Sequence, residues 1–353
     1  MSGKFNENTR VQVPAAIHLS RLGYTYLDCI DPADYDASTN ILTSVFKKAV
    51  SGLNPGMSEA EIELQLHGLI QSAKNDDLGR EFYQKITATS GVRFIDFDHP
   101  ANNLWHCTTE FTCENPDTQD NFRPDITCFV NGLPLAFIEV KKPNNHDGML
   151  AERERINTRF RNKAFRPFLN VTQLMIFSNN QEYDTENVVP VQGAFYAAVA
   201  KSKTFFNVFR EKSPSILRES GYNDEIDDDV QKRILKHRNC IPIKEDAEYQ
   251  TNLNPLSPTN RIITSMLSRR RFLFILRYSF AYVERTIELA DGTKVETLEK
   301  HIMRYQQLFA TFALRQKLSE GIKGGVIWHT QGRRFFLRSR SWSLLKDGSR
   351  HVS

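Results

Sequence analysis

Two short apolar runs separated by a turn are the clearest hydrophobic pattern in this chain. Residues 126–130 and 135–140 are rich in Ile, Val, Leu and Phe. Between them lies Asn131-Gly132, a dipeptide typical of tight turns that join antiparallel strands. The pattern therefore predicts a β-hairpin.

Apolar residues three and four positions apart predict helices elsewhere, and short buried runs predict strands. Ser58 followed by Glu61 has the spacing of a capping box at the start of a helix. Helices are predicted over residues 37–51, 58–73, 148–163, 261–281 and 298–318, and further strands over 91–97, 105–111, 171–177 and 193–198. Residues 1–20 show no clear period and are predicted to form an irregular arm. The predicted fold class is α/β, with a mixed central sheet of about five strands flanked by helices on both faces.

Three charged residues lie in the apolar setting of the predicted hairpin, namely Asp125, Glu139 and Lys141. Burying such isolated charges in a sheet costs free energy, which a protein tolerates where the charges bind a cation and take part in catalysis. Glu139 and Lys141 share a strand face because they are two residues apart. A two-residue turn would pair Asp125 with Ile138 and leave Glu139 on the opposite face. A three-residue loop, or an equivalent bulge near Pro134, would put both carboxylates on one face.

This pattern favours a metal-dependent phosphodiesterase. Two carboxylates about 5 Å apart repel each other by about 3 kcal/mol at an effective dielectric of 20, and a divalent cation reverses that sign. Mg²⁺, with Mn²⁺ as a possible substitute, binds one or two carboxylates together with phosphate oxygens and activates a bound water. Asp125 and Glu139 are the predicted metal ligands, and Lys141 is predicted to orient or deprotonate the water, or to neutralise the phosphate. The alternative is a structural salt bridge from Glu139 to Lys141 or Lys142 at a strand edge.

The net charge of +4 is unevenly distributed along the chain. Residues 256–353 carry 18 Lys and Arg against 7 Asp and Glu, whereas residues 1–255 carry 28 against 35. The N-terminal part therefore needs a local basic face if it is to hold DNA. The predicted DNA-binding residues are Lys142, Arg153, Arg155 and Arg159, which follow the hairpin directly.

Cysteine usage and hydropathy bear on the cellular compartment. The five cysteines include no C-x-x-C pair, which is typical of reduced thiols in a cytoplasmic protein. The apolar run at residues 272–276 is far too short to cross a bilayer, and the first residues lack the hydrophobic segment of a secretion signal. A cytoplasmic protein without membrane contact is predicted.

The hairpin sequence also resembles a known family. Its motifs are Arg123-Pro-Asp-Ile, Asn131-Gly-Leu-Pro-Leu and Ile138-Glu-Val-Lys-Lys-Pro143. They resemble the nuclease domain in the restriction (R) subunit of type I restriction–modification enzymes, a PD-(D/E)xK nuclease. The resemblance continues through residues 168–180 and 304–310, reaches 325–332, and covers roughly residues 20–332.

The resemblance carries several implications. It implies a restriction-endonuclease-like core with Asp125 and Glu139 as metal ligands and Lys141 as the catalytic lysine. Its implied substrate is double-stranded DNA, and its implied partners are modification and specificity subunits.

The chain departs from the family in the helix after the lysine. Many members carry a glutamine and a tyrosine four residues apart there, whereas this chain has Arg155 and Arg159, so no role is transferred to that pair. An acidic residue from an earlier helix often completes such sites. Glu59, Glu61 and Glu63 are candidates, although surface charge explains each of them better.

A second departure concerns the motor. In the family, the strand ending His-Thr-Gln-Gly leads into the phosphate-binding loop of an ATP-driven DNA translocase. Here the residues after Gly332 are Arg333, Arg334, Phe335 and Phe336, which cannot cradle a phosphate. No ATP binding is expected in this chain, and ATP is expected only in a complete subunit. The abrupt change indicates a truncated or frame-shifted subunit.

These observations give a predicted domain division and three functional hypotheses. The division is an N-terminal arm (1–20), an endonuclease domain (21–250), a linker (251–260), the first elements of a P-loop motor domain (261–332) and an unrelated basic tail (333–353). The leading hypothesis is the Mg²⁺-dependent DNA endonuclease domain of a type I restriction subunit. The alternatives are an inactive remnant of that subunit and a stand-alone nuclease with a repair-like role.

Overall fold

A seven-stranded mixed sheet forms the centre of the computed structural model, which describes residues 6–114, 121–142, 148–183, 191–201, 203–211, 215–288 and 291–322. The strand order is β1-β4-β5-β6-β7-β8-β9. The strands are β1 (Thr25–Tyr26), β4 (Trp105–Thr109), β5 (Ile126–Val130), β6 (Leu133–Val140), β7 (Leu174–Ser178), β8 (Ala194–Ala197) and β9 (Asn207–Val208). The pairs β1–β4 and β6–β7 are parallel and the others antiparallel. The predicted α/β class with a mixed, helix-flanked sheet is confirmed, but the sheet has seven strands instead of the predicted five or so.

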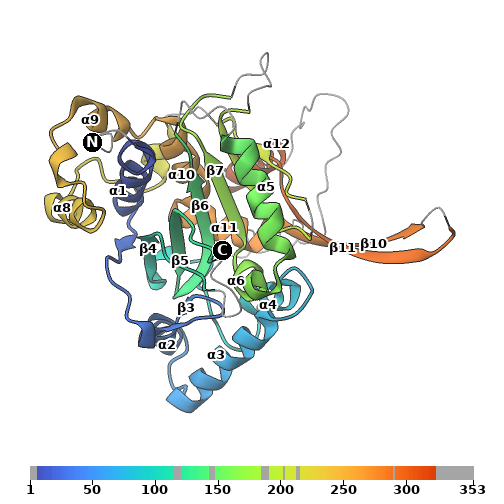
Figure 1. The fold of residues 1–353 in the computed structure, drawn as a ribbon. Helices are drawn as coiled ribbons and strands as arrows, with labels where there is room; N and C mark the ends of the chain where they lie inside the picture. The colour runs from blue at the N-terminus through green and yellow to red at the C-terminus, as the bar shows by residue number, and fades with distance from the viewer. Residues whose placement is uncertain are drawn as a thin grey trace.

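Helices cover both faces of this sheet (Figure 1). They are α1 (Val13–Arg21), α2 (Thr43–Leu53), α3 (Glu59–Ala73), α4 (Arg80–Ile86), α5 (Gly148–Arg161), α6 (Arg166–Val171), α7 (Ser215–Glu219), α8 (Asp228–His237), α9 (Ala247–Asn252), α10 (Pro258–Leu267), α11 (Arg269–Tyr278) and α12 (Tyr305–Ser319). The core on one face joins α1, α10 and α11 to apolar side chains such as Ile138. The core on the other face joins α5 and α6 to Phe137 and its neighbours.

Alternation along β6 assigns each side chain of that strand to one of these two cores. Ile138 and Val140 belong to the core under α1, whereas Phe137 belongs to the core under α5. Glu139 and Lys141 have the same parity as Phe137, so they emerge on the α5 side of the sheet. The fold therefore places α5 over the charged end of the hairpin.

Several predicted elements are confirmed and others are corrected. The capping box of Ser58 and Glu61 starts α3 as predicted. Residues 91–97 are not a strand, because their backbone groups form hydrogen bonds with side chains and not with another strand. The Arg93 amide donates to the Asn54 side chain, and the Asn131 side chain donates to the Phe94 carbonyl.

The N-terminal residues do not form an irregular arm where the structure describes them. A π-helix (Asn8–Gln12) runs directly into α1. From Val11 to Leu19 every side chain is buried, because the segment packs under the sheet and against α8 and α10. Its short run of small and apolar residues lacks a polar face, which hid the helical period.

The predicted helix over 298–318 is wrong for its first third, which ends β11 and leads into α12, and the predicted helix over 261–281 is interrupted. Strands β10 (Phe280–Glu288) and β11 (Lys294–Ile302) form a hairpin that projects from the body before α12 begins. Residues 261–278 form α10 and α11, broken at Ser268. A further two-residue pair, β2 (Tyr35–Asp36) and β3 (Ile41–Leu42), lies beside α2.

The predicted domain division stays a prediction. Helices α10 and α11 share a core with α1, and the His18 ring nitrogen lies 2.6 Å from the Thr264 hydroxyl. The end of the predicted motor segment, including Gly332, and the predicted tail at 333–353 lie outside the described residues. Within the described part of the chain, no helix is both long enough and apolar enough to span a membrane.

Candidate active site

The turn of the β5–β6 hairpin has two residues. Asn131 and Gly132 both have positive φ, 53° and 79°, as this turn type requires. The Asn131 side chain holds the turn in place through two hydrogen bonds. It accepts one from the Leu104 amide at 2.7 Å and donates one to the Phe94 carbonyl at 2.8 Å. The three-residue loop considered from the sequence is therefore not formed.

A β-bulge places Asp125 and Glu139 on the same face of the hairpin, which the two-residue turn alone would not do. Cys128 pairs with Ala136 and Phe129 with Pro134, so Leu135 is an extra residue on β6. Pro134 lacks the N–H needed for a regular ladder, which fits the irregularity beside it. Beyond the bulge Ile126 pairs with Ile138, and Asp125 consequently lies opposite Glu139 on the same face. The predicted bulge near Pro134 is confirmed.

The three predicted catalytic side chains converge at this end of the hairpin. The Lys141 ammonium Nζ lies 3.9 Å from a carboxylate oxygen of Asp125 and 3.9 Å from one of Glu139. The Val140 amide donates a 2.7 Å hydrogen bond to Asp125 Oδ2, which fixes that carboxylate at the strand end. Glu139 is 4% exposed, and the Lys141 side chain is 11% exposed.

Two further acids, which sequence reasoning did not assign, complete the cluster. Glu7, from the turn before the π-helix, lies 3.6 Å from Lys141 Nζ, and Glu152 of α5 lies 3.4 Å from it. Glu7 comes from a segment far from the hairpin in sequence and Glu152 from the helix that follows it, and no local motif marks either of them. By contrast, Glu61 caps α3 and Glu63 pairs with Lys47, so the acids considered on α3 serve surface roles.

Burial shapes the electrostatics of the cluster. Burial raises the pKa of Glu139 well above its usual range, and the neighbouring carboxylates of Asp125 and Glu152 raise it further. Burial likewise raises the pKa of Asp125 and of Glu7, against the opposing effect of Lys141. Burial alone would lower the pKa of Lys141, but the surrounding carboxylates outweigh it and the pKa lies above its ordinary value.

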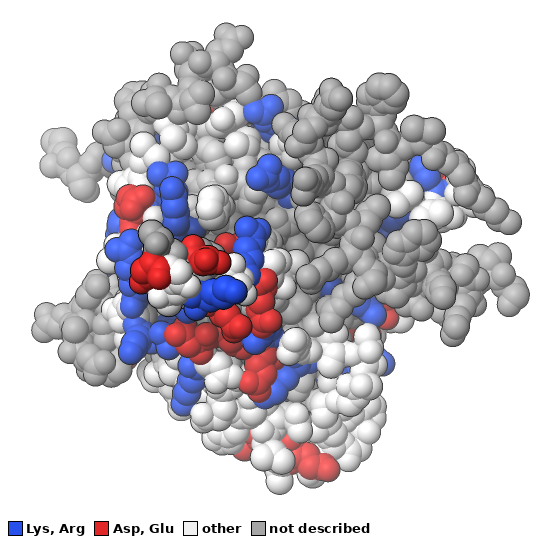
Figure 2. All heavy atoms as spheres, turned by 90° about the vertical axis from the view of Figure 1, so that its right-hand side faces the viewer, with Lys and Arg blue, Asp and Glu red and all other residues white. Residues whose placement is uncertain are grey.

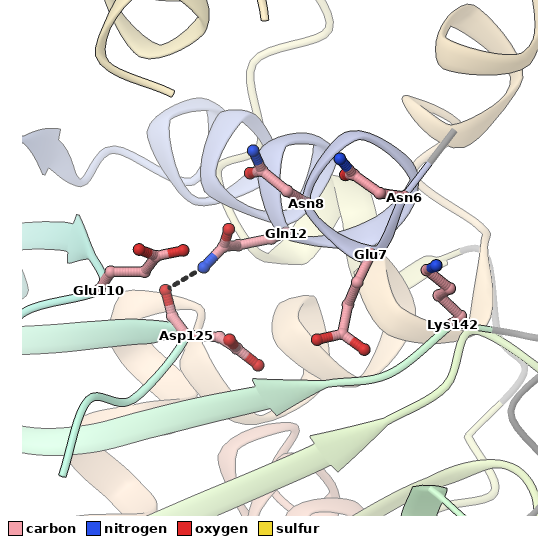
Figure 3. A pocket seen from close by; sticks show the side chains of 7 residues that line it. All are labelled: Asn6, Glu7, Asn8, Gln12, Glu110, Asp125 and Lys142. Atoms are coloured by element: carbon pink, nitrogen blue, oxygen red, sulfur yellow. Dashed lines mark hydrogen bonds between the residues drawn. The ribbon is translucent and has the colours of Figure 1, made fainter. Parts of the chain in front are cut away.

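The donor set fits a divalent cation. Glu139 Oε1 is buried and has no hydrogen-bond partner among the described residues, which is costly unless a cation or a proton satisfies it. A pocket of about 440 Å³ opens beside Asp125, and Figure 3 shows the Asp125 and Glu7 side chains lining it together with Lys142. Within the described residues, no cluster of three or more His, Cys, Asp or Glu has the arrangement of a complete metal centre. Asp125 and Glu139 are thus two carboxylates that a divalent cation could use only together with water or phosphate oxygens.

A network around Arg238, the residue directly after α8, stabilises the rim of the pocket. Gln12 donates a 2.8 Å hydrogen bond to the Asp125 carbonyl, drawn in Figure 3. Arg238 donates to Gln12 at 3.2 Å and forms an ion pair with Glu110. The N-terminal helix that carries Glu7 is thus tied to the strand that carries Asp125.

The predicted DNA-binding residues lie near the site but are partly engaged with acids. Lys142 is exposed and lines the pocket. On α5, Arg155 pairs with Glu152 at 2.9 Å and Arg153 with Glu154 at 3.6 Å, while Arg159 lies 4.1 Å from the centroid of the Phe122 ring. Figure 2, the face toward which the β10–β11 hairpin points, shows basic and acidic side chains interspersed rather than one basic surface.

Comparison with known proteins identifies the family. Residues 4–185 match the family described as type I restriction enzyme R protein N terminus, and the chain belongs to it. The putative type I restriction enzyme MjaIXP endonuclease subunit of Methanocaldococcus jannaschii is 28% identical over 167 residues, which are 41% of this chain and 16% of that protein. The MjaVIIP endonuclease subunit of the same organism, also putative, is 28% identical over 262 residues, 72% of this chain and 19% of the relative.

A third relative comes from a bacterium. The type I restriction enzyme HindI endonuclease subunit of Haemophilus influenzae is 28% identical over 127 residues, covering 31% of this chain and 12% of that protein. The chain thus spans less than a fifth of the length of these curated relatives.

Proposed function

We propose that this chain is a Mg²⁺-dependent DNA endonuclease module of a type I restriction enzyme R subunit, which hydrolyses phosphodiester bonds. One observation carries the proposal: the bulged hairpin brings Asp125, Glu139 and Lys141 together on one face, where Asp125 lines an open pocket. The proposal assigns the sheet and its helices to a restriction-endonuclease-like core, and Mn²⁺ is a plausible substitute for Mg²⁺.

Each of the three residues has a distinct role in this proposal. Asp125 and Glu139 hold the cation, which when bound supplies an activated water and offsets charge on the phosphate. Lys141 is held among carboxylates that keep it an ammonium, so it orients the water or neutralises the scissile phosphate rather than accepting a proton. Lys142 and the arginines Arg153, Arg155 and Arg159 contact the DNA backbone, which carries no sequence information.

The proposal extends to the complete enzyme. Because the relatives are named endonuclease subunits of type I restriction enzymes, we infer that the chain acts on double-stranded DNA alongside modification and specificity subunits in the cytoplasm. Residues 261–332 would begin a P-loop motor domain, and ATP would be used only by a complete subunit.

Metal binding is the first test. Calorimetric titration with Mg²⁺ or Mn²⁺ should show one class of site that is lost in Glu139→Ala and retained in Glu59→Ala, an exposed acid on α3. The titration should also release protons, because the cation must displace them from carboxyl groups whose pKa is raised. Equal binding by the native chain and Glu139→Ala would eliminate the metal site and the nuclease with it.

Plasmid nicking separates the proposal from its alternatives. We expect nicking that requires a divalent cation, is blocked by EDTA, and is lost in Asp125→Ala and Lys141→Ala. Metal binding without any nicking, even at high protein concentration, would favour the inactive remnant. Full cleavage without ATP or partner subunits would favour the stand-alone nuclease.

A further inference from the structure

Glu152 is the most deeply buried acid of the cluster and the one nearest to Lys141. Its side chain is 1% exposed, and its Oε2 lies 3.4 Å from Lys141 Nζ and 2.9 Å from Arg155 Nη1. Its other oxygen, Oε1, has no hydrogen-bond partner among the described residues, and it lies 3.9 Å from Arg159 Nη1. A carboxylate buried this deeply is costly unless it has a specific task.

Helix α5 is fixed on both sides of Glu152. Met149 and Ile156, one turn to either side, are fully buried in the core that contains Phe137. Asn157 Oδ1 accepts hydrogen bonds from the Thr204 amide at 2.7 Å and from its hydroxyl at 2.9 Å. The Glu152 carboxylate is therefore presented from a rigid element, as positioning groups in active sites must be.

We propose that Glu152 is the positioning residue that holds the Lys141 ammonium in its working place. The inference rests on the proposed nuclease function. It follows from how the four carboxylates around Lys141 are divided: Asp125, which lines the pocket, and the buried Glu139 opposite it on the hairpin are the metal ligands of that proposal. Once a cation occupies them, their charge is neutralised and a second positive centre adjoins the ammonium.

Lys141 then depends on the acids that do not bind the cation. These are Glu152 and Glu7, and Glu152 is both closer to Lys141 and on a helix anchored in the core. Lys141 is restrained further by its own contact with the Val140 carbonyl at 2.8 Å. Glu152 thus opposes the repulsion that a bound cation exerts on the lysine.

The competing explanation is structural. Glu152 pairs with Arg155 and Arg159 on its own helix, so it could serve only to stabilise α5. The two roles differ in what the loss of its charge does: a positioning role acts on the turnover rate through Lys141, whereas a structural role acts on stability and on all functions together.

Glu152→Gln in the full 353-residue chain, with Mg²⁺ and plasmid DNA, tests the inference. We expect the cleavage rate at saturating DNA and Mg²⁺ to fall roughly 10- to 100-fold, with DNA affinity changed less than about threefold and the chain still folded. Glu154→Gln, an exposed acid two residues along the same helix, should cut at the native rate. Native cleavage by Glu152→Gln, or a matching loss of DNA affinity, would overturn the proposal.

A second measurement does not depend on cleavage. Urea unfolding of Glu152→Gln, Lys141→Met and the double variant should give shifts of the midpoint that are not additive, because each change removes the same contact. Additive shifts would overturn the proposal. A native chain that binds metal but does not cut would count against the nuclease function, while coupled shifts would still uphold Glu152 as the residue that holds Lys141.

Discussion

Replacement of Lys141 by methionine should expose how much the site depends on one positive charge. The side chain is 11% exposed, and four carboxylates lie between 3.4 and 3.9 Å from its nitrogen. Methionine keeps a similar length and removes the charge. The change therefore leaves four acids around a neutral side chain.

The size of the effect follows from the distances. At an effective dielectric of about 20, one pair of unit charges at this range is worth about 4 to 5 kcal/mol before desolvation. Burying the lysine itself costs several kcal/mol, which the variant recovers. The carboxyl groups can also take up protons, which reduces the repulsion left among them. We therefore expect the free energy of unfolding to fall by about 3 to 5 kcal/mol at pH 8.

The loss should depend on pH with a definite sign. The pKa of Asp125, Glu139 and Glu7 is already raised, and removing Lys141 raises each pKa further. Groups with a raised pKa bind protons on folding, so stability falls as the pH rises through their range. The difference between the variant and the native chain should therefore be largest at pH 8 and shrink toward pH 5.

Urea denaturation of the metal-free native chain and of Lys141→Met, at pH 5 and at pH 8, measures this difference in the free energy of unfolding. Lys142→Met is the matched control, because Lys142 is the next residue but is exposed, and it should change stability by less than about 0.5 kcal/mol. A loss below 1 kcal/mol for Lys141→Met, or the same loss at pH 5 and pH 8, would refute the assignment of a buried charge cluster.

Three further outcomes are expected. Glu139→Gln should stabilise the metal-free chain at pH 8, since it removes a charge disfavoured by burial, and should abolish the rise in Tm that Mg²⁺ gives the native chain; a retained Mg²⁺ response would contradict this. Gly132→Ala should lower the free energy of unfolding in urea by about 2 to 4 kcal/mol, because the added Cβ would lie 2.5 Å from the Leu42 carbonyl oxygen. Gly221→Ala, also at positive φ but in open space, should lower it less. Burial lowers the pKa of Lys300 to about 7, so Lys300→Met should gain stability relative to the native chain as the pH falls from 9 to 6, which unfolding curves at both pH values would check.

The hairpin shows what local sequence could predict. Asn131-Gly132 fixed the turn, and the need to align Asp125 with Glu139 predicted a bulge near Pro134, which the register at Leu135 confirms. The turn and the bulge depend on residues adjacent in sequence, so the local sequence pattern is sufficient to predict both.

Glu7 and Glu152 could not be found in the same way. Glu7 approaches Lys141 only because the distant N-terminal helix packs beside the hairpin, and Glu152 does so only because α5, the next element along the chain, packs over the strand end. A single glutamate on a polar stretch has no local signature of such a role.

The β10–β11 hairpin was missed although a signal was present. Asp291-Gly292 lies between segments rich in Thr, Val and Tyr, which is typical of a hairpin turn. The helical period assigned to residues 298–318 fits only the part that forms α12.

The docking of the N-terminal helix also bears on how the chain is made. Arg10 pairs with Glu248 at 2.7 Å, and Gln12 bonds to Arg238. During synthesis the N-terminal helix leaves the ribosome first, yet Arg238 and Glu248, two of the residues that hold it, are added more than two hundred positions later. A nascent chain that stops before residue 238 lacks both of these contacts, so the N-terminal helix gains its full set of partners only after all of α8 and the start of α9 have been translated.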